Sequence, residues 1–180
     1  NGSIEDLNSK HVDTGAGFER IVAVLQGQLS NYSTDLFQPI IKKIEKITSA
    51  SYKDNPIPFQ VISDHVRMLS FALADGALPS NEGRGYVLRR ILRRAARYGR
   101  MLNMNEPFIH ELVSAVGEIM GDTYSEIIDK KIHIEKIIKS EESSFNDTLD
   151  RGLLHFKKVL QNMSGKKISG SDAFKLYDTY

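Results

Sequence analysis

The sequence predicts a mainly α-helical fold with a short β element at its N-terminus. Two observations favour this fold class: apolar residues recur at helical spacing from residue 18 onward, and a glycine-rich turn precedes the first of these helical segments. The chain has 180 residues, of which 41% are hydrophobic and 26% charged. That composition suits one globular domain, or one domain and part of another.

The N-terminal segment is the part in which we expect a strand. Asn1-Gly2 is a dipeptide typical of hairpin turns, because both residues tolerate positive φ, and residues 4–13 could form a strand that returns from that turn. The run Asp13-Thr14-Gly15-Ala16-Gly17 then breaks the chain. From Phe18 the apolar positions follow a helical period, so the expected local order is strand, glycine turn and helix.

The residues that follow predict a series of amphipathic helices. Ser33 and Thr34 could cap a helix whose apolar stripe is Leu36, Ile40, Ile41, Ile44 and Ile47, and a proline-containing loop follows at 53–58. A third helix extends to Gly76 and leads into a polar, glycine-rich loop at 79–85. We expect a fourth helix at 86–101 and a fifth at 107–121, where Pro107 suits a first helical turn.

The region from residue 123 to about residue 163 contains no proline, and its apolar residues are spaced by seven and four. This spacing predicts one long helix or two helices end to end. Lys131, Glu141 and Gly152 occupy positions where a coiled coil would need Leu or Ile. We therefore favour packing against neighbouring helices over a homodimeric coiled coil. A last short helix is expected at 172–177.

Several absences in the sequence limit the class of protein. There is neither an apolar stretch of about 18 residues nor a charged and apolar leader, which argues against a membrane span and a signal peptide. The chain has no cysteine, so disulfides and thiolate metal sites are excluded, and we expect a cytoplasmic protein. It begins without Met and ends in an apolar and aromatic run, and we interpret it as a piece of a longer protein.

The fourth expected helix is rich in arginine. Between Glu82 and Glu106 lie seven arginines and no acidic residue, although the net charge of the chain is only +1. On a helical wheel, six of them share one arc: Arg89, Arg90, Arg93, Arg94, Arg97 and Arg100. The opposite arc is apolar and holds Val87, Leu88, Ile91, Leu92, Ala95 and Tyr98. We therefore expect the arginine face to be the solvent face.

A row of guanidinium groups is typical of a surface that binds a nucleic-acid backbone, because these groups donate forked hydrogen bonds to phosphate oxygens. The alternative is a solvated face whose arginines pair with acids of other helices, such as Glu135, Glu141 and Glu142. The pattern does not distinguish DNA from RNA.

The glycine turn before Phe18 is a second candidate anion site. A helix that begins after Gly-x-Gly offers backbone N–H groups to a phosphate, and Arg20 lies in the first turn of the expected helix. The spacing is neither that of a Walker loop nor that of a Rossmann turn, and Gly27 interrupts the same helix. An ordinary strand-to-helix turn therefore stays an open alternative.

The segment Asp13-Thr14-Gly15-Ala16-Gly17-Phe18-Glu19-Arg20 resembles motif 3 of class II aminoacyl-tRNA synthetases in its alanyl form. Other segments resemble the alanyl-tRNA synthetase family in the same order along the chain. These are Ser-Asn-Tyr-Ser-Thr-Asp-Leu-Phe at 30–37, Ser-Asp-His-Val-Arg at 63–67, the stretch from Ala74 to Ala95, and Phe-Lys-Leu-Tyr-Asp-Thr-Tyr at 174–180. The resemblance covers essentially the whole chain.

The resemblance implies roles for the residues of the glycine turn. The motif 3 arginine of the family contacts the ATP phosphates, which matches Arg20, and the acidic residue that opens the motif helps to hold the amino group of alanine, which matches Asp13. These two are the implied catalytic residues. Gly15 and Gly17 would let ATP or the adenylate lie close to the backbone. The implied cofactors are ATP and Mg²⁺.

The resemblance also implies that tRNA(Ala) binds through its acceptor stem. In the family a G·U wobble pair is read by an asparagine before the arginine helix and by an aspartate near the end of this region, which match Asn81 and Asp178. Apart from the resemblance, these residues fit a turn former and a helix-end residue. Phosphate contacts are expected from Arg84, Arg89, Arg90, Arg93, Arg94 and Arg97.

The expected domain division follows from the same resemblance. Residues 1–29 would be the C-terminal end of a class II catalytic domain, and residues 30–180 a truncated helical tRNA-recognition domain. Motifs 1 and 2 would precede residue 1, and the editing domain with its zinc would follow residue 180. The alternatives are a non-enzymatic helical RNA-binding module, which would use only the arginine face, and a helical scaffold, which would bind no RNA.

Overall fold

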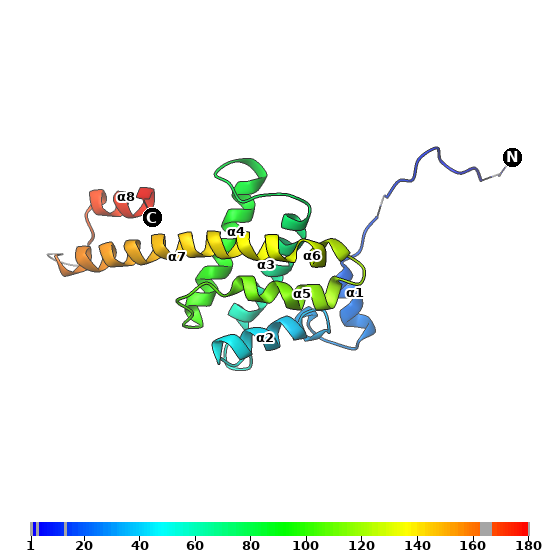
Figure 1. The fold of residues 1–180 in the computed structure, drawn as a ribbon, viewed down its shortest axis with the longest axis horizontal. Helices are drawn as coiled ribbons and strands as arrows, with labels where there is room; N and C mark the ends of the chain where they lie inside the picture. Colours follow the sequence, from blue (N-terminus) through cyan, green and yellow to red (C-terminus); the bar gives the residue numbers. More distant parts are fainter. Residues whose placement is uncertain (1, 3, 13, 163–166, 180) are drawn as a thin grey trace.

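The computed structural model describes residues 2, 4–12, 14–162 and 167–179. Figure 1 shows a bundle of helices from which an extended N-terminal segment leaves at one end and a long helix projects at the other. In chain order the elements are α1 (Phe18–Leu25), the 3₁₀ helix η1 (Asn31–Ser33), α2 (Gln38–Thr48), α3 (Pro56–Ala74), α4 (Gly83–Met101), the 3₁₀ helix η2 (Ile109–Leu112), α5 (Val113–Met120), α6 (Ser125–Asp129), α7 (Lys131–Gln161) and α8 (Gly170–Thr179).

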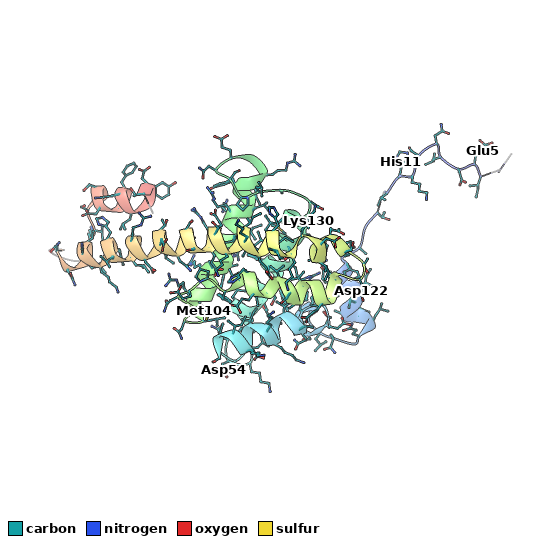
Figure 2. All side chains as sticks on the ribbon, viewed as in Figure 1. Glu5, His11, Asp54, Met104, Asp122 and Lys130 are labelled. Atoms are coloured by element: carbon teal, nitrogen blue, oxygen red, sulfur yellow. The ribbon has the colours of Figure 1, made fainter. Side chains whose placement is uncertain are left out.

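The expected N-terminal β element is wrong, because no strand forms among the described residues. The residues described before α1 extend away from the bundle, and Figure 2 shows Glu5 and His11 on this isolated segment. Ile4 and Val12 are almost fully exposed. A strand is held by hydrogen bonds to a neighbouring strand, and the described part of the chain offers none. All the regular secondary structure among the described residues is therefore helical.

The core is centred on α3, which packs against α4 along much of its length and also contacts α2, α5, α6, α7 and η2. Large apolar side chains from several elements are fully buried there, including Phe37, Phe59, Phe108, Leu92 and Ile62. Most of the apolar stripe expected for the second helix is confirmed, because Ile40, Ile41 and Ile44 of α2 are buried and Ile47 is partly buried; Leu36 lies before the helix begins. No helix within the described ranges is long and apolar enough to span a membrane.

Several helix boundaries differ from the expected ones. The cap expected at Ser33 and Thr34 is wrong: Ser30 caps η1 by accepting a hydrogen bond from the Tyr32 N–H, and α2 begins only at Gln38. Pro56 begins α3, so the preceding loop is shorter than expected. Likewise, α4 begins at Gly83, and the fifth expected helix is divided into η2 and α5.

The proline-free region after residue 123 forms two helices end to end, which is one of the two expected arrangements. α6 and α7 meet at Lys130, whose Nζ donates a hydrogen bond to the carbonyl oxygen of Ala74 at the end of α3. α7 packs against α4, η2 and α5, in agreement with the expected packing against neighbouring helices. Its C-terminal part projects beyond the bundle, and α8 lies alongside it (Figure 1).

Candidate functional site

The arginines of α4 divide into two groups. Leu88, Leu92 and Ala95 are buried against the core, whereas Val87, which was expected on the same apolar face, is 52% exposed. The helix is therefore rotated relative to the expected wheel. On its outer side Arg84, Arg90, Arg94 and Arg97 are exposed, and none of them has an ion pair within the described part of the chain.

The second group of arginines faces α7. Arg89 contacts Glu141 twice: its Nε lies 2.8 Å from Oε1, and its Nη2 donates to Oε2 at 3.2 Å. Arg93 Nε lies 3.6 Å from the same Oε1, and Arg100 Nη2 lies 2.9 Å from Asp150 Oδ2. The alternative, in which arginines pair with acids of other helices, thus applies to these three arginines. Glu141 is one of the acids expected from the sequence as partners.

Asn81 lies in the loop before α4. This loop contacts two residues of α4, Arg89 and Gly85. Oδ1 of Asn81 accepts a hydrogen bond from Nη1 of Arg89. A Cβ at Gly85 would collide with Ser80 Oγ and with the Leu78 carbonyl oxygen, so the absence of a side chain lets the loop lie directly on the first turn of α4. Ser80 Oγ also donates to the Glu82 carbonyl oxygen at 2.8 Å. These contacts hold the loop against the N-terminal part of α4.

Asp178, the second expected base reader, is exposed on α8. Figure 1 shows α8 and the loop before α4 on the same side of α7 but well separated along it. The structure therefore does not bring Asn81 and Asp178 into contact with each other.

The glycine turn before α1 lines a shallow pocket together with the exposed face of that helix: Gly15, Ala16, Gly17, Arg20, Ile21, Val24 and Leu25. A Cβ at Gly17 would lie 3.2 Å from Arg20 Cδ, so the glycine leaves room for the arginine side chain to lie across the turn. Arg20 is exposed and has no ion pair with a described residue. Asp13 lies outside the described residues.

A buried arginine connects α1 to the rest of the bundle. Arg67 on α3 is only 9% exposed, its Nη2 lies 3.0 Å from Glu19 Oε1, and its guanidinium carbon lies 4.4 Å from the centre of the Phe37 ring. Glu19 is the residue next to Arg20. Sequence reasoning missed this contact because its partners lie far apart in the sequence, although Glu19 and Arg67 both fall within motif-like segments.

The acid next to Glu141 has a different environment. Glu142 is 1% exposed and accepts a hydrogen bond from the Ile109 N–H at 3.0 Å. Burial raises the pKa of Glu142 to about 7, although hydrogen bonds from the backbone of Phe108 and Ile109 oppose that rise. It therefore pairs with the backbone of η2 and not with the arginines. No cluster of three or more potential metal-ligating side chains occurs among the described residues.

A family model for tRNA synthetases class II (A) matches residues 1–180, which is the whole chain. This chain belongs to that family. The match includes both the glycine turn with Arg20 and the arginine-bearing helix α4 with its preceding loop.

Curated relatives agree with the family match. This chain is 53% identical over 187 residues to an alanine–tRNA ligase of Chlorobium chlorochromatii (strain CaD3), an alignment that covers 99% of this chain and 21% of the relative. It is 54% identical over 182 residues to an alanine–tRNA ligase of Streptococcus sanguinis (strain SK36), covering 98% of this chain and 21% of the relative. The chain thus spans about a fifth of the length of these relatives.

Proposed function

We propose that this chain is part of an alanine–tRNA ligase, which activates alanine with ATP and transfers it to tRNA(Ala). The observation that carries the proposal is the identity of 53–54% to alanine–tRNA ligases over almost all of this chain. Residues 1–29 would belong to the catalytic domain and residues 30–180 to the tRNA-recognition region. A cytoplasmic location is part of the same proposal.

The glycine turn and α1 would form one wall of the ATP site. The exposed Arg20 beside Gly15 and Gly17 suits a phosphate, because its guanidinium is a forked donor and the glycines allow close approach of the ligand. ATP supplies the adenylyl group that activates the alanine carboxylate, with pyrophosphate as the leaving group, and Mg²⁺ bound with ATP would neutralise phosphate charge. Asp13 would hold the amino group of alanine.

The outer face of α4 would bind the acceptor stem. Arg84, Arg90, Arg94 and Arg97 suit phosphate oxygens because they are exposed and not neutralised by described acids. Arg89 and Arg93 belong to the same proposed surface, but Glu141 offsets part of their charge. Asn81 and Asp178 would read the wobble pair, with the RNA lying between the loop and α8.

Alanine-dependent pyrophosphate exchange by the full-length protein that contains this chain tests the proposal. The unmodified protein should exchange, and Arg20→Gln should reduce the rate by at least about a hundredfold, because loss of a charged phosphate contact at a reacting centre costs on the order of 3 kcal/mol. Arg151→Gln, which removes an exposed arginine of α7, is the matched control.

Exchange separates the proposal from the alternative of a non-enzymatic RNA-binding module, which the exposed arginines of α4 would also suit. Absence of exchange together with salt-dependent RNA binding would favour that alternative. A full-length protein that exchanges equally well with Arg20→Gln would remove the proposed role of the glycine turn.

A further inference from the structure

One continuous set of contacts joins α7 to the loop that carries Asn81. Glu141 is 14% exposed and Arg89 22% exposed at their side chains, so both are largely shielded from water. Glu141 binds Arg89 through Nε at 2.8 Å and Nη2 at 3.2 Å, and the remaining terminal nitrogen, Nη1, donates to Asn81 Oδ1. Nη1 and Nη2 thus each donate a hydrogen bond to one of these two partners, whereas Nε lies within ion-pair distance of Glu141 without a hydrogen bond.

The chemistry of arginine fixes which way the Asn81 amide points. A guanidinium has donors and no acceptor, so only the carbonyl oxygen of the amide can face it. The amide NH₂ must then point away from Arg89, and no described residue accepts a hydrogen bond from it. A free asparagine could present either group to a ligand, whereas this one presents its donor.

We propose that Glu141 is a positioning residue for tRNA recognition: through Arg89 it holds Asn81 so that the amide NH₂ is presented to an acceptor on a base edge. This inference rests on the proposed function. It states that Asn81 acts only as a hydrogen-bond donor in recognition, although a free asparagine could donate or accept. In this role Arg89 links Glu141 to Asn81.

The loop would otherwise have little to fix its side chains. Its backbone is held by the close approach to Gly85 and by the Ser80–Glu82 hydrogen bond, but neither contact reaches the Asn81 amide. Shielding from water also strengthens the ion pair relative to an exposed one. Through Arg89, Glu141 is therefore placed to restrict the side-chain rotamer of Asn81, which the backbone contacts of the loop do not fix.

The test compares variants of the full-length protein with two tRNA substrates, one with the wobble pair and one with a Watson–Crick pair at the same position. We expect Glu141→Gln to lower kcat/KM for aminoacylation of the wobble substrate by about tenfold, and to lower the ratio of wobble to Watson–Crick activity. Asn81→Asp retains an acceptor for Arg89 and removes the NH₂ donor, so it should lose as much wobble activity as Asn81→Ala. Glu135→Gln, also on α7, is the control and should match the unmodified protein.

A double variant separates positioning from a general effect on folding. If Glu141 acts through Asn81, then Glu141→Gln combined with Asn81→Ala should be no worse than Asn81→Ala alone. Additive losses, or equal losses on both tRNAs, would overturn the inference, as would full wobble activity in Asn81→Asp. Arg89→Lys, which keeps the charge but not the fork, should reproduce the selective loss.

The same measurements distinguish failure of the inference from failure of the proposed function. An unmodified full-length protein without alanine-dependent pyrophosphate exchange would overturn both. An active protein in which Glu141→Gln keeps its wobble preference would overturn the positioning role of Glu141 alone.

Discussion

Replacing Glu142 by Gln should remove a loss of stability that occurs as the pH rises, because the buried carboxyl of Glu142 ionises only at an unfavourable cost. The carboxyl is 1% exposed and receives the Ile109 N–H at 3.0 Å, and its pKa is raised from 4.5 to about 7 by burial. Gln keeps an acceptor for the N–H but cannot ionise. The variant therefore removes the titration while it preserves the hydrogen bond.

The sign follows from which state holds the proton. Below pH 4.5 the Glu142 carboxyl is protonated in both the folded and the unfolded chain. Between that value and about 7 the folded chain keeps a proton that the unfolded chain has released, so the free energy of unfolding falls as the pH rises. At about 1.4 kcal/mol per unit of pKa, the loss reaches about 3 kcal/mol above neutral pH.

Urea unfolding of the 180-residue chain, followed by far-ultraviolet circular dichroism at several pH values, measures this effect. We expect Glu142→Gln to unfold with a similar free energy to the unmodified chain in acid, and to be more stable by about 3 kcal/mol at pH values above neutral. Glu118→Gln, which removes an exposed carboxylate from α5, controls for the change in net charge. A stability difference that stays constant with pH would refute the reasoning.

Three further predictions follow from other contacts. Glutamine in place of Arg90, Arg94 and Arg97 should reduce the slope of log affinity against log salt for duplex RNA by about one per arginine, and an unchanged slope would move the phosphate contacts elsewhere. Gly99→Ala should destabilise the chain by about 1–3 kcal/mol in urea unfolding, because the new Cβ would lie 2.5 Å from Cε1 of the buried Phe108. Arg67→Ala should cost about 2–3 kcal/mol in the same assay, more than Arg151→Ala, because it removes a buried guanidinium that contacts both Glu19 and the Phe37 ring.

The sequence predicted the helices well where the apolar spacing was dense. In α2 the stripe of Ile40, Ile41 and Ile44 is buried as expected, because side chains three or four residues apart share one helix face. The N-terminal segment shows the opposite case. Gly2 does adopt a positive φ of 71°, as a hairpin turn would require, but a strand needs a partner that no local signal supplies.

Which arginines face solvent could not be predicted from α4 alone. Arg89 and Arg90 are adjacent in the sequence, yet Arg89 is bound to Glu141, and Arg90 is exposed. Glu141 lies 52 positions from Arg89, so their contact depends on how α7 crosses α4. The helical wheel identified the charged face of α4. Tertiary packing determined which arginines of that face are exposed and which form ion pairs with α7.

The neighbouring acids Glu141 and Glu142 have different environments because they point in different directions from α7. Both were candidates to pair with the arginines, and successive residues of a helix differ by about 100° in direction. Glu141 consequently faces α4, whereas Glu142 faces η2 and is buried there. The orientation of α7 thus places Glu141 in an ion pair and buries Glu142, whose pKa is raised to about 7.

α7 connects the two proposed base readers. In its N-terminal half, Glu141 holds Arg89 and through it Asn81, while Arg100 is fixed to the same helix by Asp150. Farther along, α8 with Asp178 packs on α7 beyond the bundle (Figure 1). A continuous helix transmits position over its length with little bending, so the separation of the two readers is set largely by α7 itself. An RNA that contacts both must match that separation, and the exposed arginines of α4, on the face that α7 does not cover, are then free to hold its backbone.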